Sequence, residues 1–464
     1  MNDMTRVIAA ISTPPGKGGV AVIRMSGDGA LDIASKAFLP RSGKKISDYP
    51  PRYQIYGDLM DGGEAVDDVL LTYFRAPSSY TGEDTVEISC HGGTLVTRTV
   101  LEALFTLGAV PAEAGEFTKR AFINGRLSLT DAESIGNLLE AKDRTGLRLH
   151  SGAARERLNS KIAELRGELT DLLSSAFARI DYPDEDLGDF DDEEFMLRLK
   201  KIESGVSTLK DTYRVGRAIS DGIDTVICGK PNVGKSSFYN LIVGEEAAIV
   251  TEIEGTTRDV LQRTVSLGGV TLRLADTAGI RKREGIDRVE QIGIDRSLQS
   301  IEKCELLFAL FDLSRPFDRE DEEIIKAISE SNAVKIAILN KSDLETSFDP
   351  ARLEGLFTHT LVFSAKCSPE ENLGEVANTV NRIFYEGKIS ISDDAIISSA
   401  RQHAELTRAH LHLTDAVCAL RDGFSQDAVS FDVEQALGAI SELDGRRVNE
   451  EVVDDIFSKF CVGK

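Results

Sequence analysis

Hydrophobic residues change their spacing along the chain, and these changes divide it into regions of different structure. In residues 1–125, short apolar runs such as 20–23 and 69–74 alternate with turns that contain glycine and proline. Short apolar runs between such turns are typical of strands. We therefore expect residues 1–125 to form a compact α+β domain.

Helical spacing replaces these runs from Leu127 onward. Thr130 and Glu133 stand in the positions of a capping box, which predicts the start of a helix. The helical pattern continues to about Gly216. It crosses an acidic run at residues 181–194, which we interpret as a solvated loop before the next helix, because it lacks the spacing of a Ca²⁺-binding loop. Six apolar residues in this region fall on one helical stripe: Leu158, Ile162, Leu165, Leu169, Leu172 and Leu173.

The region from about residue 222 to 386 alternates strand and helix patterns, as a parallel sheet with crossover helices requires. Residues 306–311 and 334–339 are apolar throughout or nearly so, which predicts buried strands. Helical spacing then returns in a set of apolar residues: Leu406, Leu413, Val417, Leu420, Val433, Leu437, Ile440, Val453, Ile456, Phe457 and Phe460.

Helices on both sides of an α/β region indicate one helical bundle interrupted by an inserted domain, and two separate helical domains are the alternative. Domain insertion is favoured because the ends of a domain often lie close together. The predicted boundaries are 1–125 for the N-terminal domain, 126–221 and 387–464 for the two parts of the bundle, and 222–386 for the insert. The expected fold class is multidomain, α+β and α/β.

Composition narrows the classes of function. The net charge of −23 argues against broad, nonspecific nucleic-acid binding, which needs many cationic contacts to phosphates. Apolar runs are too short for a membrane-spanning helix, so we expect no membrane association. The six cysteines form no C-x-x-C pair, which argues against a structural zinc site and favours a reducing compartment, the cytoplasm.

The strongest motif is a phosphate-binding loop at residues 229–237, which reads Gly-Lys-Pro-Asn-Val-Gly-Lys-Ser-Ser. It follows an apolar run and precedes a helical run, which is the setting that this motif requires. Backbone N–H groups and the helix N-terminus attract phosphate oxygens. Lys235 would neutralise the β- and γ-phosphates, and the Ser236 hydroxyl would bind Mg²⁺.

Four further motifs follow in the order expected of a GTPase. Residues 256–257 are a threonine pair suited to closing over the γ-phosphate, and residues 276–279 read Asp-Thr-Ala-Gly. Asp343, in Asn-Lys-Ser-Asp, would accept hydrogen bonds from guanine N1 and N2, which adenine cannot donate. Residues 364–366, Ser-Ala-Lys, match the companion loop under the base. Five motifs in order indicate GTP. The predicted GTP-binding residues are Asn232, Val233, Gly234, Lys235, Ser236, Ser237, Thr251, Thr256, Thr257, Asp276, Thr277, Ala278, Gly279, Asn340, Lys341, Asp343, Ser364, Ala365 and Lys366.

One expected residue is missing from this set. Ras-like enzymes carry a glutamine after Asp-x-x-Gly that orients the attacking water, whereas this chain has Ile280. An aliphatic side chain cannot hold water. Hydrolysis therefore needs another group to orient water and to stabilise charge on the leaving phosphate.

These motifs resemble those of the MnmE (TrmE) tRNA-modification GTPases over the whole chain. The phosphate loop, the Gly-Thr-Thr-Arg-Asp at 255–259 and the Cys-Val-Gly-Lys at 461–464 are similar to that family's. So are residues 12–19, 80–84 and 115–122. The resemblance implies an N-terminal folate-binding domain that also dimerises, a helical domain, and a Ras-like G domain inserted into the bundle.

The resemblance also implies an activity and partners. A homodimer would work with the flavoprotein MnmG (GidA), which carries FAD, in a heterotetramer. Together they would add an aminomethyl-type group to carbon 5 of the wobble uridine of certain tRNAs, with the carbon supplied by a methylene-tetrahydrofolate. A second class remains open, in which the chain is a GTP-dependent assembly switch that binds ribosomal RNA without modification chemistry. That class usually has a basic RNA-binding domain, and this chain is acidic.

The family's G domains use K⁺ where others use an arginine finger. By resemblance, Asn232, Thr251, Ile253 and Thr256 would form the K⁺ site, and Ser236 with Thr257 the Mg²⁺ site. For Asn232 the alternative is a loop residue that makes local hydrogen bonds. Glu290 matches the catalytic glutamate that orients water, with Glu284 as the alternative.

Folate is the third implied ligand. Arg24, Glu87 and Arg126 match the family's folate-binding positions, together with Lys464. For Arg24 and Glu87 the alternative is an internal ion pair. Cys461 is a candidate nucleophile near the folate carbon, or else a packing residue. His91 is interpreted as a structural turn residue, because nothing in the sequence pairs with it.

Overall fold

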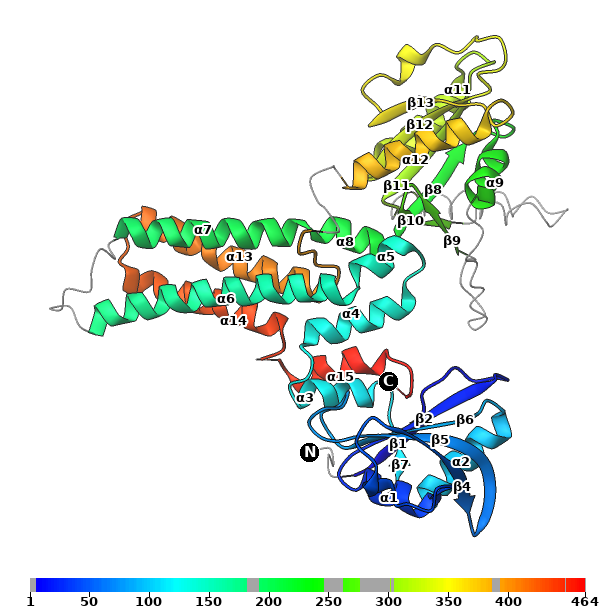
Figure 1. The fold of residues 1–464 in the computed structure, drawn as a ribbon. Coiled ribbons are helices and arrows are strands. Elements are labelled where there is room, and N and C mark those ends of the chain that lie inside the picture. The colour runs from blue at the N-terminus through cyan, green and yellow to red at the C-terminus, as the bar shows by residue number, and fades with distance from the viewer. Residues whose placement is uncertain are drawn as a thin grey trace. The chain divides into compact units, whose positions relative to one another are not determined.

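The computed structural model describes residues 6–181, 192–245, 262–275, 301, 304–385, 393–446 and 448–463. The chain divides into two compact units (Figure 1). The first comprises Met1–Gly136 and Ser430–Lys464, and the second comprises Asn137–Val429. Among the helices that lie in the described ranges, none is both long and apolar enough to cross a membrane.

The first unit contains a seven-stranded sheet in the order β3-β4-β5-β6-β2-β1-β7. Neighbouring strands are antiparallel except β1 and β7, which are parallel. The expected strands at 20–23 and 69–74 are confirmed within β2 and β5. The strands are β1 (Ile8–Ile11), β2 (Val20–Ser26), β3 (Phe38–Pro40), β4 (Gln54–Asp61), β5 (Glu64–Phe74), β6 (Thr85–His91) and β7 (Val110–Pro111).

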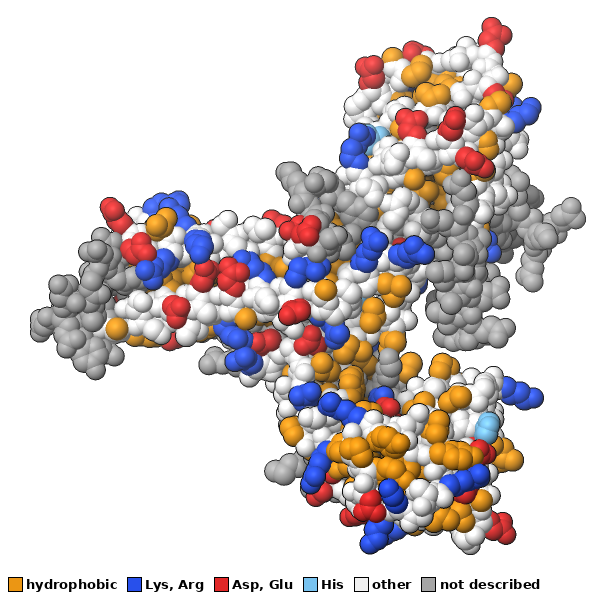
Figure 2. Space-filling view, viewed as in Figure 1, with side chains coloured by type: hydrophobic (Ala, Val, Ile, Leu, Met, Phe, Trp, Pro, Cys, Tyr) orange, Lys and Arg blue, Asp and Glu red, His pale blue; other side chains and the backbone are white. Residues whose placement is uncertain are grey.

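Two helices cover one face of this sheet. Alternate residues of the central strands, such as Ile23, Leu71 and Ile88, pack in one core with α1 (Ala30–Ala37) and α2 (Thr94–Thr106). The residues between them point to the opposite face, where apolar side chains remain exposed, including Val20, Tyr56 and Leu70. Figure 2 shows hydrophobic side chains gathered over this unit. One face of the sheet therefore carries apolar area that the described chain does not bury.

The remaining helices of the first unit connect its two chain segments. In α3 (Glu116–Ile123), the Phe122 ring packs at a tilt against Phe457 of α15 (Glu450–Ser458), with ring centroids 6.2 Å apart. α4 spans Leu129–Glu140, and the short helix η1 spans Ile46–Asp48. The predicted capping box at Thr130 is wrong. Ser128 and Asp131 cap α4 instead, and the Thr130 hydroxyl, inside the helix, donates to the Leu443 carbonyl at 2.7 Å.

The second unit contains the helical bundle. Its long helices are α6 (Gly152–Asp181), α7 (Asp192–Asp211) and α13 (Ala400–Arg421), with the shorter α5 (Arg144–Leu149) and α8 (Tyr213–Ser220). The next helix, α14 (Gln426–Leu443), begins in this unit, but its residues from Ser430 onward belong to the first. The six-residue stripe predicted along α6 is confirmed, because all six side chains are buried. These residues face the bundle because 3.6-residue periodicity places them on one side of the helix.

A six-stranded sheet is inserted between α8 and α13, in the order β13-β12-β11-β8-β10-β9. Its strands are parallel except β9, which pairs antiparallel with β10. The strands expected at 306–311 and 334–339 are confirmed as β11 and β12. The elements are β8 (Ile223–Gly229), α9 (Lys235–Glu245), β9 (Gln262–Leu267), β10 (Val270–Ala275), β11 (Leu306–Asp312), α11 (Arg319–Ser329), β12 (Val334–Asn340), η3 (Pro350–Leu353), β13 (His359–Val362) and α12 (Pro369–Tyr385).

The chain enters and leaves this sheet close to one place. The Ile397 N–H, on the way out, donates to the Thr212 hydroxyl, on the way in, at 3.1 Å. At Gly216 in α8, a Cβ atom would lie 2.0 Å from the Ile397 carbonyl oxygen, so only glycine fits. This contact between entry and exit is what an insertion into the bundle requires.

Candidate functional site: the nucleotide loops

The phosphate-binding loop joins the end of β8 to the start of α9. Gly229 and Gly234 adopt φ values of +143° and +102°, and Asn232 adopts +66°. A Cβ atom at Gly234 would lie 2.1 Å from Nδ2 of Asn340, the last residue of β12, so no other residue fits at this position of the loop. The glycines of the motif are therefore required by both backbone conformation and close packing.

The polar residues of the loop stand at the start of α9. Lys235 lies at the first position of α9, and its Nζ donates to the carbonyls of Gly229 and Lys230, each at 2.6 Å. The ammonium is thus held over the inside of the loop. Asn232, Ser236 and Ser237 are exposed beside it. Backbone N–H groups, a helix N-terminus and an ammonium together make a site for a polyphosphate.

Asn340 connects this loop to both loops expected under the base. The side chain is 2 % exposed. Its Nδ2 donates to the Val233 carbonyl at 2.7 Å, and its Oδ1 accepts from the Ala365 N–H at 3.3 Å. One buried amide therefore fixes the phosphate loop, the end of β12 and the loop after β13 relative to one another.

Asp343 lies exposed at the mouth of this arrangement. Its Oδ1 accepts a hydrogen bond from Ser364 Oγ at 2.7 Å. This bond lowers the pKa of Asp343 below its ordinary value. The Ser364 hydroxyl in turn accepts from the N–H groups of Lys366 and Cys367. An ionised carboxylate held in this way suits the paired N–H donors of guanine.

Several predicted residues lie outside the described residues. They are Thr251, Ile253, Thr256, Thr257, Asp276, Thr277, Ala278, Gly279, Ile280, Glu284, Glu290 and Lys464. Most of them flank one hairpin, because β9 begins at Gln262 and β10 ends at Ala275.

The structure also adds residues that the motifs do not contain. Lys230 is 8 % exposed and pairs with Asp318 and Asp321 of the α11 N-terminus. Asp312 pairs with Lys341. These partners lie 29 to 91 positions apart in the chain, so no local pattern identifies them.

A second group of predicted residues meets in the first unit. Arg24 on β2 and Glu87 on β6 are directly opposite in register and form an ion pair, with Nη2–Oε1 at 2.8 Å. The guanidinium also lies 5.5 Å from the ring centre of Tyr80. Gly82, two residues after Tyr80, lies against the side chain of Arg126. A Cβ atom added at Gly82 would be 3.1 Å from Arg126 Cγ. The loop at 80–82 thus brings three of the four predicted folate residues, Arg24, Glu87 and Arg126, into one neighbourhood.

The end of the chain lies against the same unit. Cys461 is exposed, and its carbonyl accepts from the Gly115 N–H at 3.4 Å. Val462 bridges to Ala114, and the Ser12 hydroxyl donates to the Gly463 carbonyl at 2.9 Å. The tail that carries Cys461 is therefore seated on the N-terminal domain.

His91, interpreted from the sequence as a structural turn residue, has a partner that no sequence pattern indicates. It ends β6, where its Nδ1 lies 2.7 Å from Asp67 Oδ1 and its N–H donates to Asp67 Oδ2 at 2.8 Å. The hydrogen bond to the Asp67 carboxylate raises the pKa of His91. The partner lies on a neighbouring strand 24 residues away, which explains why the sequence did not reveal it.

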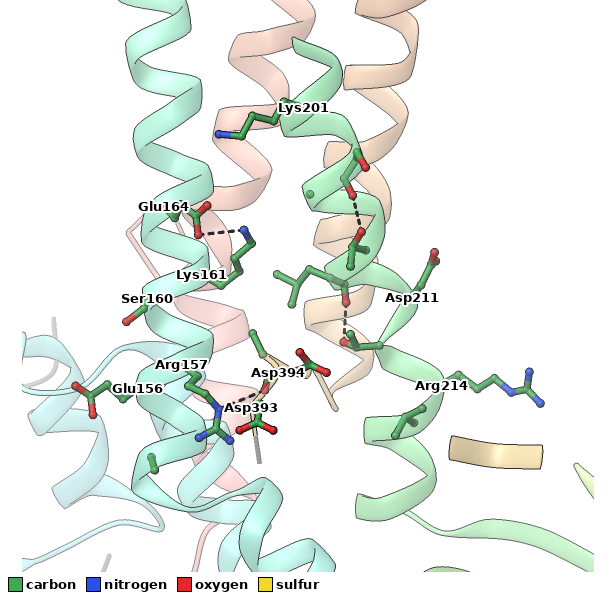
Figure 3. A pocket seen from close by; sticks show the side chains of 18 of the residues that line it. Glu156, Arg157, Ser160, Lys161, Glu164, Lys201, Asp211, Arg214, Asp393 and Asp394 are labelled. Carbon is green, nitrogen blue, oxygen red and sulfur yellow. Dashed lines mark hydrogen bonds and ion pairs between the residues drawn. The ribbon is translucent and has the colours of Figure 1, made fainter. Parts of the chain in front are cut away.

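A separate cavity of about 1230 Å³ lies in the helical bundle and is lined by none of the predicted site residues that the structure describes (Figure 3). Cations and carboxylates line it together: Arg157, Lys161, Lys201, Arg214, Glu156, Glu164, Asp211, Asp393 and Asp394. Several are paired with each other, such as Lys161 with Glu164 at 3.0 Å. Its balanced charge gives no preference for a phosphate, so we do not assign the nucleotide to it.

Known families match nearly the whole chain. Residues 7–126 match the model described as GTP-binding protein TrmE N-terminus, and residues 129–461 match the MnmE helical domain. A tRNA modification GTPase MnmE of Clostridioides difficile (strain 630) is 36 % identical over 98 % of this chain and 99 % of its own. The proteins of that name from Natranaerobius thermophilus and Thermoanaerobacter pseudethanolicus are each 37 % identical over the same shares. With its phosphate loop, its base loops and this similarity from end to end, the chain belongs to the MnmE family of tRNA modification GTPases.

Proposed function

We propose that this protein is a K⁺-stimulated GTPase that modifies the wobble uridine of certain tRNAs. With the flavoprotein MnmG, which carries FAD, it adds a carboxymethylaminomethyl-type group to carbon 5, using the carbon of a methylene-tetrahydrofolate. The observation that carries the proposal is the connection of the phosphate loop to both base loops through the buried Asn340.

The residues present fit GTP with its cations. Ser236 has an exposed hydroxyl in the first turn of α9, where it could bind a Mg²⁺ ion held by the phosphates. Asn232 is exposed in the loop and offers an amide oxygen to K⁺. A fixed monovalent cation beside the phosphates supplies the positive charge that other GTPases take from an arginine. Glu290 is proposed to orient the attacking water.

The K⁺ proposal is tested by GTP hydrolysis in KCl against NaCl. We expect the wild type to be faster in KCl by roughly tenfold or more, and Asn232→Ala to hydrolyse equally slowly in both salts. Asn332→Ala, an exposed asparagine of the same domain, is the matched control and should keep the K⁺ response. Equal rates for the wild type in the two salts would refute the K⁺ mechanism.

Folate binding is proposed for the first unit. Glu87 faces a partly open site, since the side chains of Arg24 and Glu87 are 20 % and 29 % exposed. A carboxylate suits the N–H groups of a pterin, and Arg126 suits the carboxylates of the glutamate tail. The Arg24–Glu87 ion pair holds the carboxylate in place, so the internal pair and the binding role are compatible.

A charge-removing variant tests this site. In the full-length protein, Glu87→Gln should weaken tetrahydrofolate binding by roughly tenfold, because a charged acceptor is lost, and leave GTP hydrolysis unchanged. Titration calorimetry measures the first and phosphate release the second. Glu64→Gln, at the exposed start of β5, is the control. Binding as tight as in the wild type would place folate elsewhere.

The exposed sheet face of the first unit supports a homodimer. Val20, Tyr56 and Leu70 remain 64 %, 45 % and 37 % exposed on strands whose other face is buried. A second copy of the same domain is the proposed occupant, as the family resemblance implies.

Mass spectrometry of the wobble uridine after deletion of this protein separates the two classes of function, since unchanged modification would favour the assembly switch.

A further inference from the structure

The connection between β11 and α11 places carboxylates against two different nucleotide loops. Residues 312–321 read Asp-Leu-Ser-Arg-Pro-Phe-Asp-Arg-Glu-Asp. None of them belongs to a GTPase motif identified above. Three carboxylates of this segment, Asp312, Asp318 and Asp321, bind lysines of the phosphate loop and of the base loop.

On the phosphate side, the segment holds Lys230. Its Nζ donates to Asp321 Oδ2 at 2.7 Å and to Asp318 Oδ2 at 2.8 Å. Asp321 is 1 % exposed, and its Oδ2 also accepts the Asp318 N–H that begins α11. Its Oδ1 has no hydrogen-bond partner among the described residues. A buried carboxylate of this kind requires a cation to compensate its charge, so removing either Lys230 or Asp321 would leave the other charge buried and unpaired.

Lys230 is in turn part of the phosphate cradle. Its carbonyl accepts a hydrogen bond from Lys235 Nζ at 2.6 Å. The Lys230 side chain is therefore bound by carboxylates at the start of α11, and its main-chain carbonyl contacts the Lys235 ammonium proposed to bind the phosphates. A shift of Lys230 would displace the carbonyls and N–H groups that form the cradle.

On the base side, the segment holds Lys341. Asp312 ends β11, is 4 % exposed, and accepts from Lys341 Nζ at 2.6 Å. Its other oxygen accepts from Ser314 N–H and Oγ. Burial would raise the pKa of Asp312, but the bonds from Lys341 and Ser314 keep it below its ordinary value. Lys341 has a φ of +67° two residues before Asp343, so its anchor also constrains the loop that carries Asp343.

We propose that residues 312–321 are a positioning segment that sets the phosphate loop and the base loop at a fixed separation. Asp321 positions the loop that holds the β-phosphate, and Asp312 positions the loop that reads guanine. Both act through lysines and touch no nucleotide themselves. One rigid strand-to-helix connection thereby matches the site to the length of a guanosine diphosphate.

Nucleotides that differ at one end test this assignment, by competition against a fluorescent GDP on the full-length protein. GDP and GMP differ in the β-phosphate, whereas GDP and IDP differ in the 2-amino group of the base. Asp321→Asn should lower the preference for GDP over GMP by about tenfold and leave the preference for GDP over IDP unchanged. Asp312→Asn should do the reverse, lowering the preference for GDP over IDP by about fivefold. Glu322→Gln, at an exposed position in the first turn of α11, is the control and should leave both preferences unchanged.

A purely structural role predicts a different result. It would lower the unfolding temperature and weaken all three nucleotides by the same factor, and that outcome overturns the proposal. If Asp321→Asn does not fold, Lys230→Arg serves instead, because it keeps the charge pair but changes its length. This variant should unfold at the wild-type temperature with a reduced preference for GDP over GMP. An unchanged preference in folded Lys230→Arg also overturns the proposal.

Discussion

Individual buried polar residues in this protein depend on partners that are distant in sequence. His150 is 2 % exposed, next to the small core formed by Leu149, Val215, Ile219 and Ile396. Its Nε2 lies 2.7 Å from the Ser220 hydroxyl, at the end of the helix that leads into the inserted domain. Burial lowers the pKa of His150 to about 4. The residue is therefore neutral in the folded protein at pH values where it would be protonated in the unfolded chain.

This difference predicts a pH dependence of stability. Because the folded pKa lies below the unfolded value of about 6.5, the contribution is complete above pH 6.5 and is lost as the pH falls towards 4. Over that range the wild type should lose about 3 kcal/mol more than His150→Gln, measured by urea unfolding at each pH. Ser220→Ala keeps the buried imidazole and should retain the wild-type dependence. Parallel curves for the wild type and His150→Gln would contradict the assignment.

Whole elements were predictable where the information is local. The phosphate loop, the buried strands β11 and β12 and the stripe of α6 follow from spacing within a few turns of chain. Side-chain pairs across elements were not predictable. The buried Arg120 binds Glu83 across 37 residues, and Lys230 binds Asp321 across 91. The capping box was misplaced by two residues because Ser128 and Thr130 offer similar hydroxyls, and only the Leu443 carbonyl shows which lies inside the helix.

The turn of the β9–β10 hairpin gives a test at the scale of elements. Gly268 and Gly269 both have positive φ, +63° and +80°. A Cβ at Gly268 would lie 2.4 Å from the Ala377 carbonyl of α12, whereas one at Gly269 would meet only Thr145 Oγ1 at 3.6 Å. Asn381 Nδ2 also donates to the Gly268 carbonyl at 2.6 Å.

Two alanine variants separate backbone conformation from packing at this turn. Both variants should have a lower free energy of unfolding, because alanine is strained at a positive φ. Gly268→Ala should lose about 1–3 kcal/mol more, because its methyl group forces the hairpin away from α12. Thermal unfolding measures the difference, and hydrogen exchange should show α12 less protected only in Gly268→Ala. Equal losses in the two variants would mean that the contact with α12 contributes nothing.

At the scale of the whole molecule, the proposed chemistry is divided between two units. The nucleotide loops lie in the unit Asn137–Val429, whereas the proposed folate residues and the end of the chain lie in the other. The tail packs closely there: Gly463 has a φ of +96°, and a Cβ atom added to it would lie only 2.3 Å from the Ile11 carbonyl oxygen. A change in the tail should therefore affect one activity without the other.

Gly463→Ala tests this separation. The added methyl group cannot fit against Ile11, so the tail should detach from Ser12 and carry Cys461 away from the N-terminal domain. We expect faster release of the last residues by carboxypeptidase, weaker tetrahydrofolate binding and reduced wobble-uridine modification, with GTP hydrolysis unchanged. Gly43→Ala, at φ +76° in open surroundings of the same unit, controls for the backbone effect alone. If Gly463→Ala slowed GTP hydrolysis as much as modification, the two units would have to work as one site, and the division of chemistry between them would be wrong.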